Sequence, residues 1–292
     1  MVPIRKTLKL SKIELSYLEW NAKNNNQASV KLMLLHGLAD HALVWSSLAD
    51  HLKENYHIIA PDLRGHGNST KSEEGYGFQE VIEDLEALMN QLQWSNAHIL
   101  GHSWSGKLLP IWAKQHPERF QSMILVDPIF ITRIPSIFKL TLPLVYRKLD
   151  CLKGMGPFNS FSEAEQNARK LGQYSDWSEL QQQVFQGGIE QKKDGKWGSK
   201  FTIAARNQIF AAVMNTPGFT ELIDIPSLLI KPERGVNRMA WQLKPYQTYL
   251  KNLTIQQVPG NHWPFLVKPA IFNQVIQQFL GQQTQYLVSK TS

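Results

Sequence analysis

Short apolar runs alternate with longer amphipathic segments over most of the chain. In FQEVIEDLEALMNQL, which begins at Phe78, apolar residues recur every three or four positions, as they do on one face of a helix. The run SMILVD, residues 122–127, has no polar alternation, which is typical of a strand buried on both faces. This pattern predicts helices at 43–54, 78–93, 105–115 and 270–280, and strands at 5–10, 13–19, 31–35, 57–60, 97–101, 122–127, 226–231 and 253–258. Strands that alternate with helices favour an α/β fold, with a mostly parallel sheet covered on both faces.

The alternation stops between residues 133 and 219. This stretch is rich in glutamine, aromatic and basic residues, and it contains no convincing strand run. Ser162 is followed three residues later by Glu165, which is a capping-box pattern for the start of a helix. We therefore predict a helical cap at 133–219, inserted into a core formed by 1–132 and 220–292.

Composition excludes several classes of protein. The 292 residues, 42% of them hydrophobic and 19% charged, are enough for one large core. The formal charge of +7 is not concentrated in a dense basic run, so we expect no nucleic-acid partner. No apolar stretch approaches the roughly 20 residues of a membrane span, so we expect no integral membrane association. A single cysteine, Cys151, and the absence of a secretory leader pattern fit a reducing, cytoplasmic location.

The segment ILGHSWSG, residues 99–106, ends an apolar run in a serine between small residues. A sharp strand-to-helix bend needs small residues two positions before and after its tip, and here these are Gly101 and Ser105. The pattern predicts that Ser103 projects its hydroxyl above the sheet, as the nucleophile of a G-x-S-x-G elbow in which serine replaces the last glycine. A match this short is common by chance, and an ordinary loop serine is the alternative.

A serine hydroxyl needs a base and an oxyanion hole before it can perform acyl transfer. In VPGNHWPF, His262 follows the last predicted strand, from which it can lean back toward Ser103. In MLLHGLADHALVW, Gly37 allows a tight turn after another strand. We therefore predict His262 as the base and the backbone amides of Leu38 and Trp104 as the oxyanion donors.

Four segments, LLHGLADHALVW, IIAPDLRGHGNS, LGHSWSG and PGNHWP, together resemble the α/β-hydrolase superfamily in order and spacing. The resemblance covers roughly 1–130 and 222–282, but not the insert. It implies an eight-stranded, mostly parallel sheet, a triad in the chain order serine, acid, histidine, and a cap after strand six. The stretch 64–67, Arg-Gly-His-Gly, matches a family turn whose role is mainly structural.

The triad acid departs from the pattern that the resemblance implies. The usual acid follows strand seven, where the register here places Gly235. Glu233 lies two positions early, and Asn237, two positions late, is an amide without negative charge. Asp127 ends predicted strand six, a location that some family members use, and a carboxylate at a buried strand end needs a partner. We predict Asp127 as the acid and keep Glu233 as the alternative.

A serine nucleophile with an oxyanion hole predicts hydrolysis of a carboxylic ester or thioester of a largely apolar small molecule, through an acyl-enzyme and without cofactor or metal. A serine at the elbow argues against the family's epoxide hydrolases and haloalkane dehalogenases, which use an aspartate there. We expect Trp263, Phe138 and Tyr146 to line the substrate pocket. A non-catalytic ligand receptor, a cofactor-free perhydrolase and a carbon–carbon bond hydrolase are the alternatives.

Overall fold

The computed structural model describes residues 3–21, 30–132 and 155–291. Within these ranges, eight strands form one sheet in the order β1-β2-β4-β3-β5-β6-β9-β10. The first three strands in this order pair antiparallel, and all later neighbours pair in parallel. Each predicted strand overlaps one of these eight, which are β1 (Ile4–Lys9), β2 (Glu14–Trp20), β3 (Val30–Leu35), β4 (Tyr56–Pro61), β5 (Ala97–His102), β6 (Phe120–Val126), β9 (Ser227–Arg234) and β10 (Leu253–Asn261). The mostly parallel, eight-stranded sheet is therefore confirmed.

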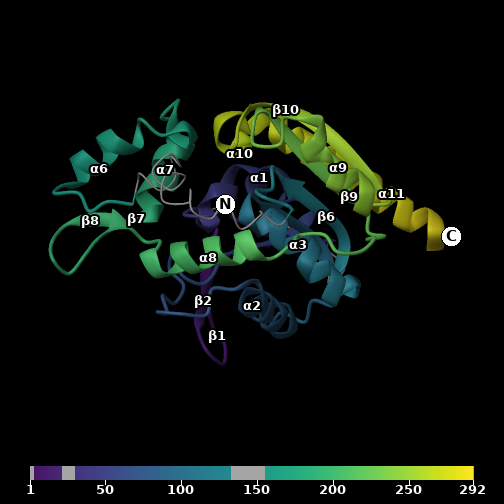
Figure 1. Cartoon of the computed structure of the whole chain (residues 1–292), viewed down its shortest axis with the longest axis horizontal. Coiled ribbons are helices and arrows are strands. Elements are labelled where there is room, and N and C mark those ends of the chain that lie inside the picture. The colour runs from purple at the N-terminus through teal and green to yellow at the C-terminus, as the bar shows by residue number, and fades with distance from the viewer. Residues whose placement is uncertain (1–2, 22–29, 133–154, 292) are drawn as a thin grey trace.

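Helices cover both faces of the sheet (Figure 1). Along β3, Met33 and Leu35 pack into one apolar core, whereas Leu32 and Leu34 pack into the other. This alternation follows from the pleat, which turns successive side chains to opposite faces. On the first face lie α2 (Phe78–Gln91), α3 (Trp104–Gln115) and α9 (Ala240–Tyr249), and on the second lie α1 (Ser46–Leu52), α10 (Pro264–Val267) and α11 (Pro269–Thr291).

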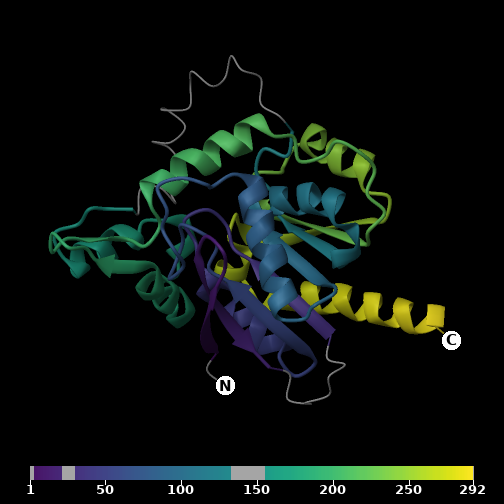
Figure 2. The ribbon, with the colours of Figure 1, turned by 90° about the horizontal axis from the view of Figure 1, so that it is seen from below.

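The chain between β6 and β9 forms further helices and one small strand pair. Its elements are α6 (Phe161–Ala168), α7 (Glu179–Gly188), β7 (Ile189–Gln191), β8 (Trp197–Ser199) and α8 (Ile203–Asn215). Figure 2 shows α6, α7 and the β7–β8 hairpin as a lobe beside the sheet, and α8 running from that lobe along one edge of the core. Short 3₁₀ turns lie at η1 (Ala42–Trp45), η2 (Pro117–Arg119) and η4 (Gly172–Tyr174). The sequence showed no convincing strand run in this stretch, but residues 189–191 pair with residues 197–199.

The predicted capping box was also misplaced. The cap of α6 is Ser160, whose hydroxyl accepts a hydrogen bond from the Glu163 amide at 3.1 Å. Ser162 lies inside the helix, which begins at Phe161, and the Phe161 ring packs against Trp197 at 5.1 Å. The helix cap thus lies at Ser160, two residues before the predicted cap at Ser162. The first helical residue, Phe161, makes a tertiary aromatic contact there. The division of the chain into core and cap stays a prediction.

No helix in the described ranges combines the length and the hydrophobicity needed to cross a bilayer.

Candidate active site

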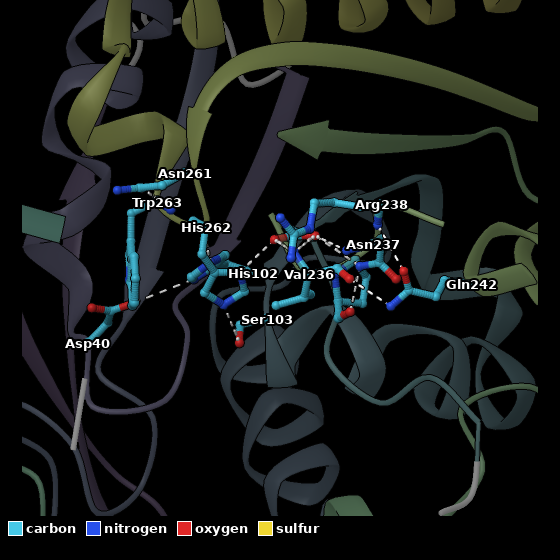
Figure 3. A network of polar contacts seen from close by, with 12 residues as sticks. Asp40, His102, Ser103, Val236, Asn237, Arg238, Gln242, Asn261, His262 and Trp263 are labelled. Atoms are coloured by element: carbon cyan, nitrogen blue, oxygen red, sulfur yellow. Dashed lines mark hydrogen bonds and ion pairs between the residues drawn. The ribbon is translucent and has the colours of Figure 1, made fainter. Parts of the chain in front are cut away.

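Three polar side chains from distant parts of the chain meet at the carboxyl edge of the sheet. Ser103 directly follows β5, Asp127 directly follows β6, and His262 directly follows β10. His262 Nε2 lies 3.0 Å from Ser103 Oγ, and its Nδ1 lies 2.6 Å from Asp127 Oδ2. Figure 3 shows the His262 ring above the Ser103 hydroxyl. The geometry therefore links a hydroxyl, an imidazole and a carboxylate in one hydrogen-bonded chain.

Ser103 occupies a strained bend between β5 and α3. Its φ of 59° and ψ of −116° lie outside the regions that non-glycine residues usually adopt. A Cβ added to Gly101 would lie 2.7 Å from the Ser105 carbonyl oxygen, so the strand and the helix meet too closely for any side chain there. The Ser105 hydroxyl donates a hydrogen bond to the His36 carbonyl at 2.5 Å. The serine that replaces the last glycine of the motif thus ties the bend to the neighbouring strand.

Asp127 is fully buried, and every contact to its carboxylate comes from a donor. Oδ1 accepts from the Asn237 amide at 3.1 Å and from the Asn237 side chain at 2.9 Å, and Oδ2 accepts from the Val236 amide at 2.9 Å. Burial alone raises the pKa of Asp127, but the bond to His262 and these donors outweigh it and lower the pKa below its usual value. The buried carboxylate is therefore held ionised beside the imidazole.

The turn after β9 is shaped around this carboxylate. A Cβ added to Gly235 would lie 2.5 Å from Asp127 Oδ2, so a side chain at that position cannot coexist with Asp127 in this conformation. Glu233, the alternative acid, lies exposed near the end of β9. Asn237, set aside in the sequence because it carries no charge, donates its side-chain amide to Asp127, as His262 donates its Nδ1 proton. The structure thus brings Asp127 to His262 and leaves Glu233 at the surface.

One predicted oxyanion donor, Trp104, lies at the bend, and the other, Leu38, lies in the turn after β3. Trp104 is the first residue of α3, and the first amides of a helix have no acceptor within it. Leu38 lies in a tight turn closed by a hydrogen bond of 3.3 Å from the Asp40 amide to the Gly37 carbonyl. A Cβ on Gly37 would lie 2.4 Å from His102 Nδ1, so this turn packs closely on β5. Their role as oxyanion donors stays a proposal.

A buried histidine, His102, joins the turn that contains Leu38 to the loop of His262. His102 Nε2 donates to the His262 carbonyl at 2.8 Å, because a carbonyl can only accept. Its Nδ1 lies 3.5 Å from Asp40 Oδ2, and the same oxygen accepts from Trp263 Nε1 at 3.2 Å (Figure 3). Burial lowers the pKa of His102. The sequence contained His102 and Asp40 within the quoted motifs, but nothing local indicated that they meet.

Of the three aromatic residues predicted to line the substrate pocket, the structure describes Trp263, whose ring lies 4.9 Å from the His262 ring. The Trp263 side chain is 9% exposed and belongs to the apolar core on the α11 face. Trp104 is 1% exposed and stacks with His66 at 6.1 Å, and His66, from the predicted structural turn, stacks with Phe201 at 4.3 Å. Phe138 and Tyr146 lie outside the described residues. In the described ranges, no group of three or more histidine, cysteine or acidic side chains is arranged to hold a metal ion.

Comparison with known proteins identifies relatives of this chain. A family model described as alpha/beta hydrolase fold matches residues 31–269. Epoxide hydrolase 4 of Mus musculus is 24% identical over 275 residues, which cover 87% of this chain and 74% of that protein. An uncharacterised protein of Mycobacterium tuberculosis is 30% identical over 115 residues, and the match covers 39% of this chain and 34% of that protein. The chain thus spans about a third of the length of that relative.

Solved structures share the fold at low sequence identity. The structure of E-2-(acetamidomethylene)succinate hydrolase superposes with a TM-score of 0.79 at 21% identity, and the match covers 96% of this chain and 100% of that one. A marine microorganism esterase superposes with a TM-score of 0.72 at 22% identity, over 91% of this chain and 98% of that one.

Proposed function

Because this chain belongs to the α/β-hydrolase fold family, we propose that it is a serine hydrolase that cleaves a carboxylic ester or thioester of a largely apolar small molecule. The observation that supports this most strongly is the chain from Ser103 through His262 to Asp127, with contacts of 3.0 Å and 2.6 Å at a strained bend. Strain of this kind is costly, and it is typical of sites where a reactive group must be held in one orientation.

In the proposed reaction, Ser103 Oγ attacks the ester carbonyl while its proton moves to His262 Nε2. The amides of Leu38 and Trp104 stabilise the negative oxygen of the tetrahedral intermediate. When the intermediate collapses, the bond to the leaving alcohol or thiol breaks, and His262 returns its proton to that group. Water then attacks the acyl-enzyme by the same route and releases the carboxylic acid and the free serine.

Asp127 has two tasks in this proposal. Its carboxylate accepts the Nδ1 proton of His262, which leaves Nε2 unprotonated and facing the serine. It also stabilises the positive charge that the imidazole gains during each proton transfer. Since the carboxylate is buried and fully supplied with donors, it need not reorganise during the reaction.

The serine also supports one reaction class over another. The matching relatives include a protein named epoxide hydrolase 4, but the bend here carries a hydroxyl, which forms an acyl-enzyme from an ester. We therefore place the substrate among esters and thioesters.

The predicted cap would cover this site, and three contacts support that arrangement. Asn261 Nδ2 donates to the Gly172 carbonyl at 2.8 Å, next to His262. Gln181 Nε2 donates to the Leu266 carbonyl at 3.2 Å. Lys107, one turn after Ser103, donates its ammonium to the Val213 carbonyl at 2.6 Å. Chain from the insert is thus bonded both to the segment around His262 and to the helix that follows Ser103.

Labelling with a fluorophosphonate probe tests the proposal directly. The native protein should be labelled at Ser103, and a series of p-nitrophenyl esters of increasing acyl length should be turned over, with a maximum that measures the pocket. Ser103→Ala should abolish both signals. If the native protein resists labelling, or if Ser103→Ala hydrolyses p-nitrophenyl acetate at the native rate, the hydrolase proposal is wrong and a ligand receptor becomes the better account.

A further inference from the structure

Exposed apolar side chains gather beside the candidate active site. Eight large apolar side chains of the described residues are exposed. Three of them come from two loops, 128–132 after β6 and 235–239 between β9 and α9, and a fourth comes from the first turn of α9. These four, which we call the rim patch, are Phe130 at 39% exposed, Val236 at 40%, Met239 at 59% and Trp241 at 72%. The two loops are joined by a hydrogen bond of 2.8 Å from the Asn237 side chain to the Pro128 carbonyl. Large apolar groups concentrated in this way on a surface usually mark an interaction site.

A groove continues the rim patch. It has a volume of about 320 Å³ and is bordered by Trp241, Ile131 and the stacked rings of Phe219 and Tyr249, whose centroids lie 5.6 Å apart. Lys244, one turn after Trp241 on α9, borders the same groove. The groove therefore offers a largely apolar lining with a lysine cation next to Trp241.

In residues 233–244, which carry most of the rim patch, three charged side chains are basic and one, the exposed Glu233, is acidic. Arg234, Arg238 and Lys244 are exposed around it, and none of them takes part in an ion pair within the described ranges. From Arg234 to the last residue the sequence contains no aspartate or glutamate. The same stretch carries six basic residues, which are Arg234, Arg238, Lys244, Lys251, Lys268 and Lys290.

We propose that the rim patch docks on an anionic phospholipid surface. In this arrangement, Trp241 and Met239 enter the boundary between headgroups and acyl chains, and Arg234, Arg238 and Lys244 lie at the lipid phosphates. Tryptophan next to basic residues is the composition that favours this boundary, since the indole has an apolar body and a polar N–H. Each basic residue near an anionic membrane strengthens binding by about fivefold.

The loop 235–239, which carries Val236 and Met239 of the rim patch, also holds the carboxylate of Asp127, the proposed triad acid. The amides of Val236 and Asn237 donate to Asp127 at 2.9 Å and 3.1 Å, so a lipid surface on the rim patch would lie within a few residues of the site. This deepens the proposed function and rests on it in one respect, namely that the ester hydrolysed would be one that partitions into membranes. Docking itself does not require hydrolysis.

Vesicle flotation tests the proposal with the full chain carrying Ser103→Ala, so that hydrolysis cannot alter the lipid. Vesicles of phosphatidylcholine alone and of phosphatidylcholine with 30% phosphatidylglycerol are compared at 50 and 300 mM sodium chloride. We expect binding to the anionic vesicles at low salt that falls at least tenfold at high salt. Trp241→Ser should weaken it at least fivefold, and the pair Arg238→Glu and Lys244→Glu should abolish it.

Matched variants elsewhere on the surface separate docking from general effects of charge and hydrophobicity. Ile271→Ser removes an apolar side chain on α11 that is 45% exposed, and Lys193→Glu reverses a charge between β7 and β8; both should bind like the parent. In the background that retains Ser103, Trp241→Ser should hydrolyse water-soluble p-nitrophenyl acetate at the native rate. If the protein that retains Ser103 binds vesicles but hydrolyses no ester, the docking proposal stands and only the hydrolase proposal is wrong.

Three results would overturn the docking proposal. One is the absence of binding to anionic vesicles at 50 mM salt. Another is an equal loss of binding in the rim patch variants and the matched variants. The third is a concentration-dependent dimer that Trp241→Ser converts to monomer while vesicle binding is absent, because a second copy of the chain would then cover the rim patch.

Discussion

Replacing Asp127 with asparagine removes one negative charge and keeps the shape of the side chain. The carboxylate accepts from the Val236 amide, the Asn237 amide, the Asn237 side chain and His262. An asparagine must direct its NH₂ group at one of these positions. The backbone amides cannot change their protonation, but the imidazole can exchange its proton between its two nitrogens.

The substituted amide should therefore direct its NH₂ group toward His262 Nδ1. His262 would then carry its proton on Nε2, which lies 3.0 Å from Ser103 Oγ and would no longer be able to accept the serine proton. Loss of the correct tautomer in a triad lowers turnover by about 10⁴-fold. At 1.36 kcal/mol per tenfold, this corresponds to about 5 kcal/mol of transition-state stabilisation.

The assay is kcat/KM for a p-nitrophenyl ester, measured with the native protein and with Asp127→Asn. Glu233→Gln is the matched control, because it makes the same acid-to-amide change at the exposed alternative, and its kcat/KM should stay within about twofold. Thermal unfolding of each variant shows whether a loss of activity reflects a loss of fold. Full turnover by Asp127→Asn, combined with inactivity of Glu233→Gln, would refute the assignment of the acid.

Three further predictions concern the parts that support the site. Burial lowers the pKa of His98 to about 4, so the stability that depends on its neutral ring is present above pH 6.5 and is lost as the pH falls toward 4. In urea unfolding at pH 6.5 and pH 4, His98→Gln should remove about 3 kcal/mol of this loss of stability on acidification. The control Ile99→Val should lower the unfolding free energy equally at the two pH values. Gly101→Ala places a Cβ 2.7 Å from backbone, and we expect it to cost about 1–3 kcal/mol of unfolding free energy and to reduce fluorophosphonate labelling; native labelling would contradict the close approach. Ser105→Ala removes the hydrogen bond to the His36 carbonyl, and urea unfolding should show a loss of about 1–3 kcal/mol, whereas unchanged stability would argue against that bond.

The strands and the elbow could be predicted because their signals are local. A parallel strand buried on both faces requires a continuous apolar run, and SMILVD overlaps β6. The seven other predicted strands also overlap observed strands. The bend at Ser103 requires small neighbours, and Gly101 and Ser105 stand at the two positions. Each of these constraints acts over a few residues, so a single sequence is enough to express it.

The insert was harder to predict because its signals are weak over short lengths. The strands β7 and β8 have three residues each, too few for any alternation to stand out. The start of α6 coincides with the packing of Phe161 against Trp197, a contact between segments far apart in the chain. Local patterns identified helices here, but they did not define where each helix begins.

The amino-acid sequence by itself determined the order of the strands and helices, the serine at the bend and the histidine after the last strand, because each depends on residue types within one short segment. Only the tertiary structure decided which carboxylate reaches His262, since Asp127 is 135 residues away and Gly235 leaves the space that its carboxylate fills. The contact of His102 with the His262 loop was decided in the same way. Hydrogen bonds of this kind depend on positions in space that the packing of the whole sheet defines, and no local pattern of residues encodes them.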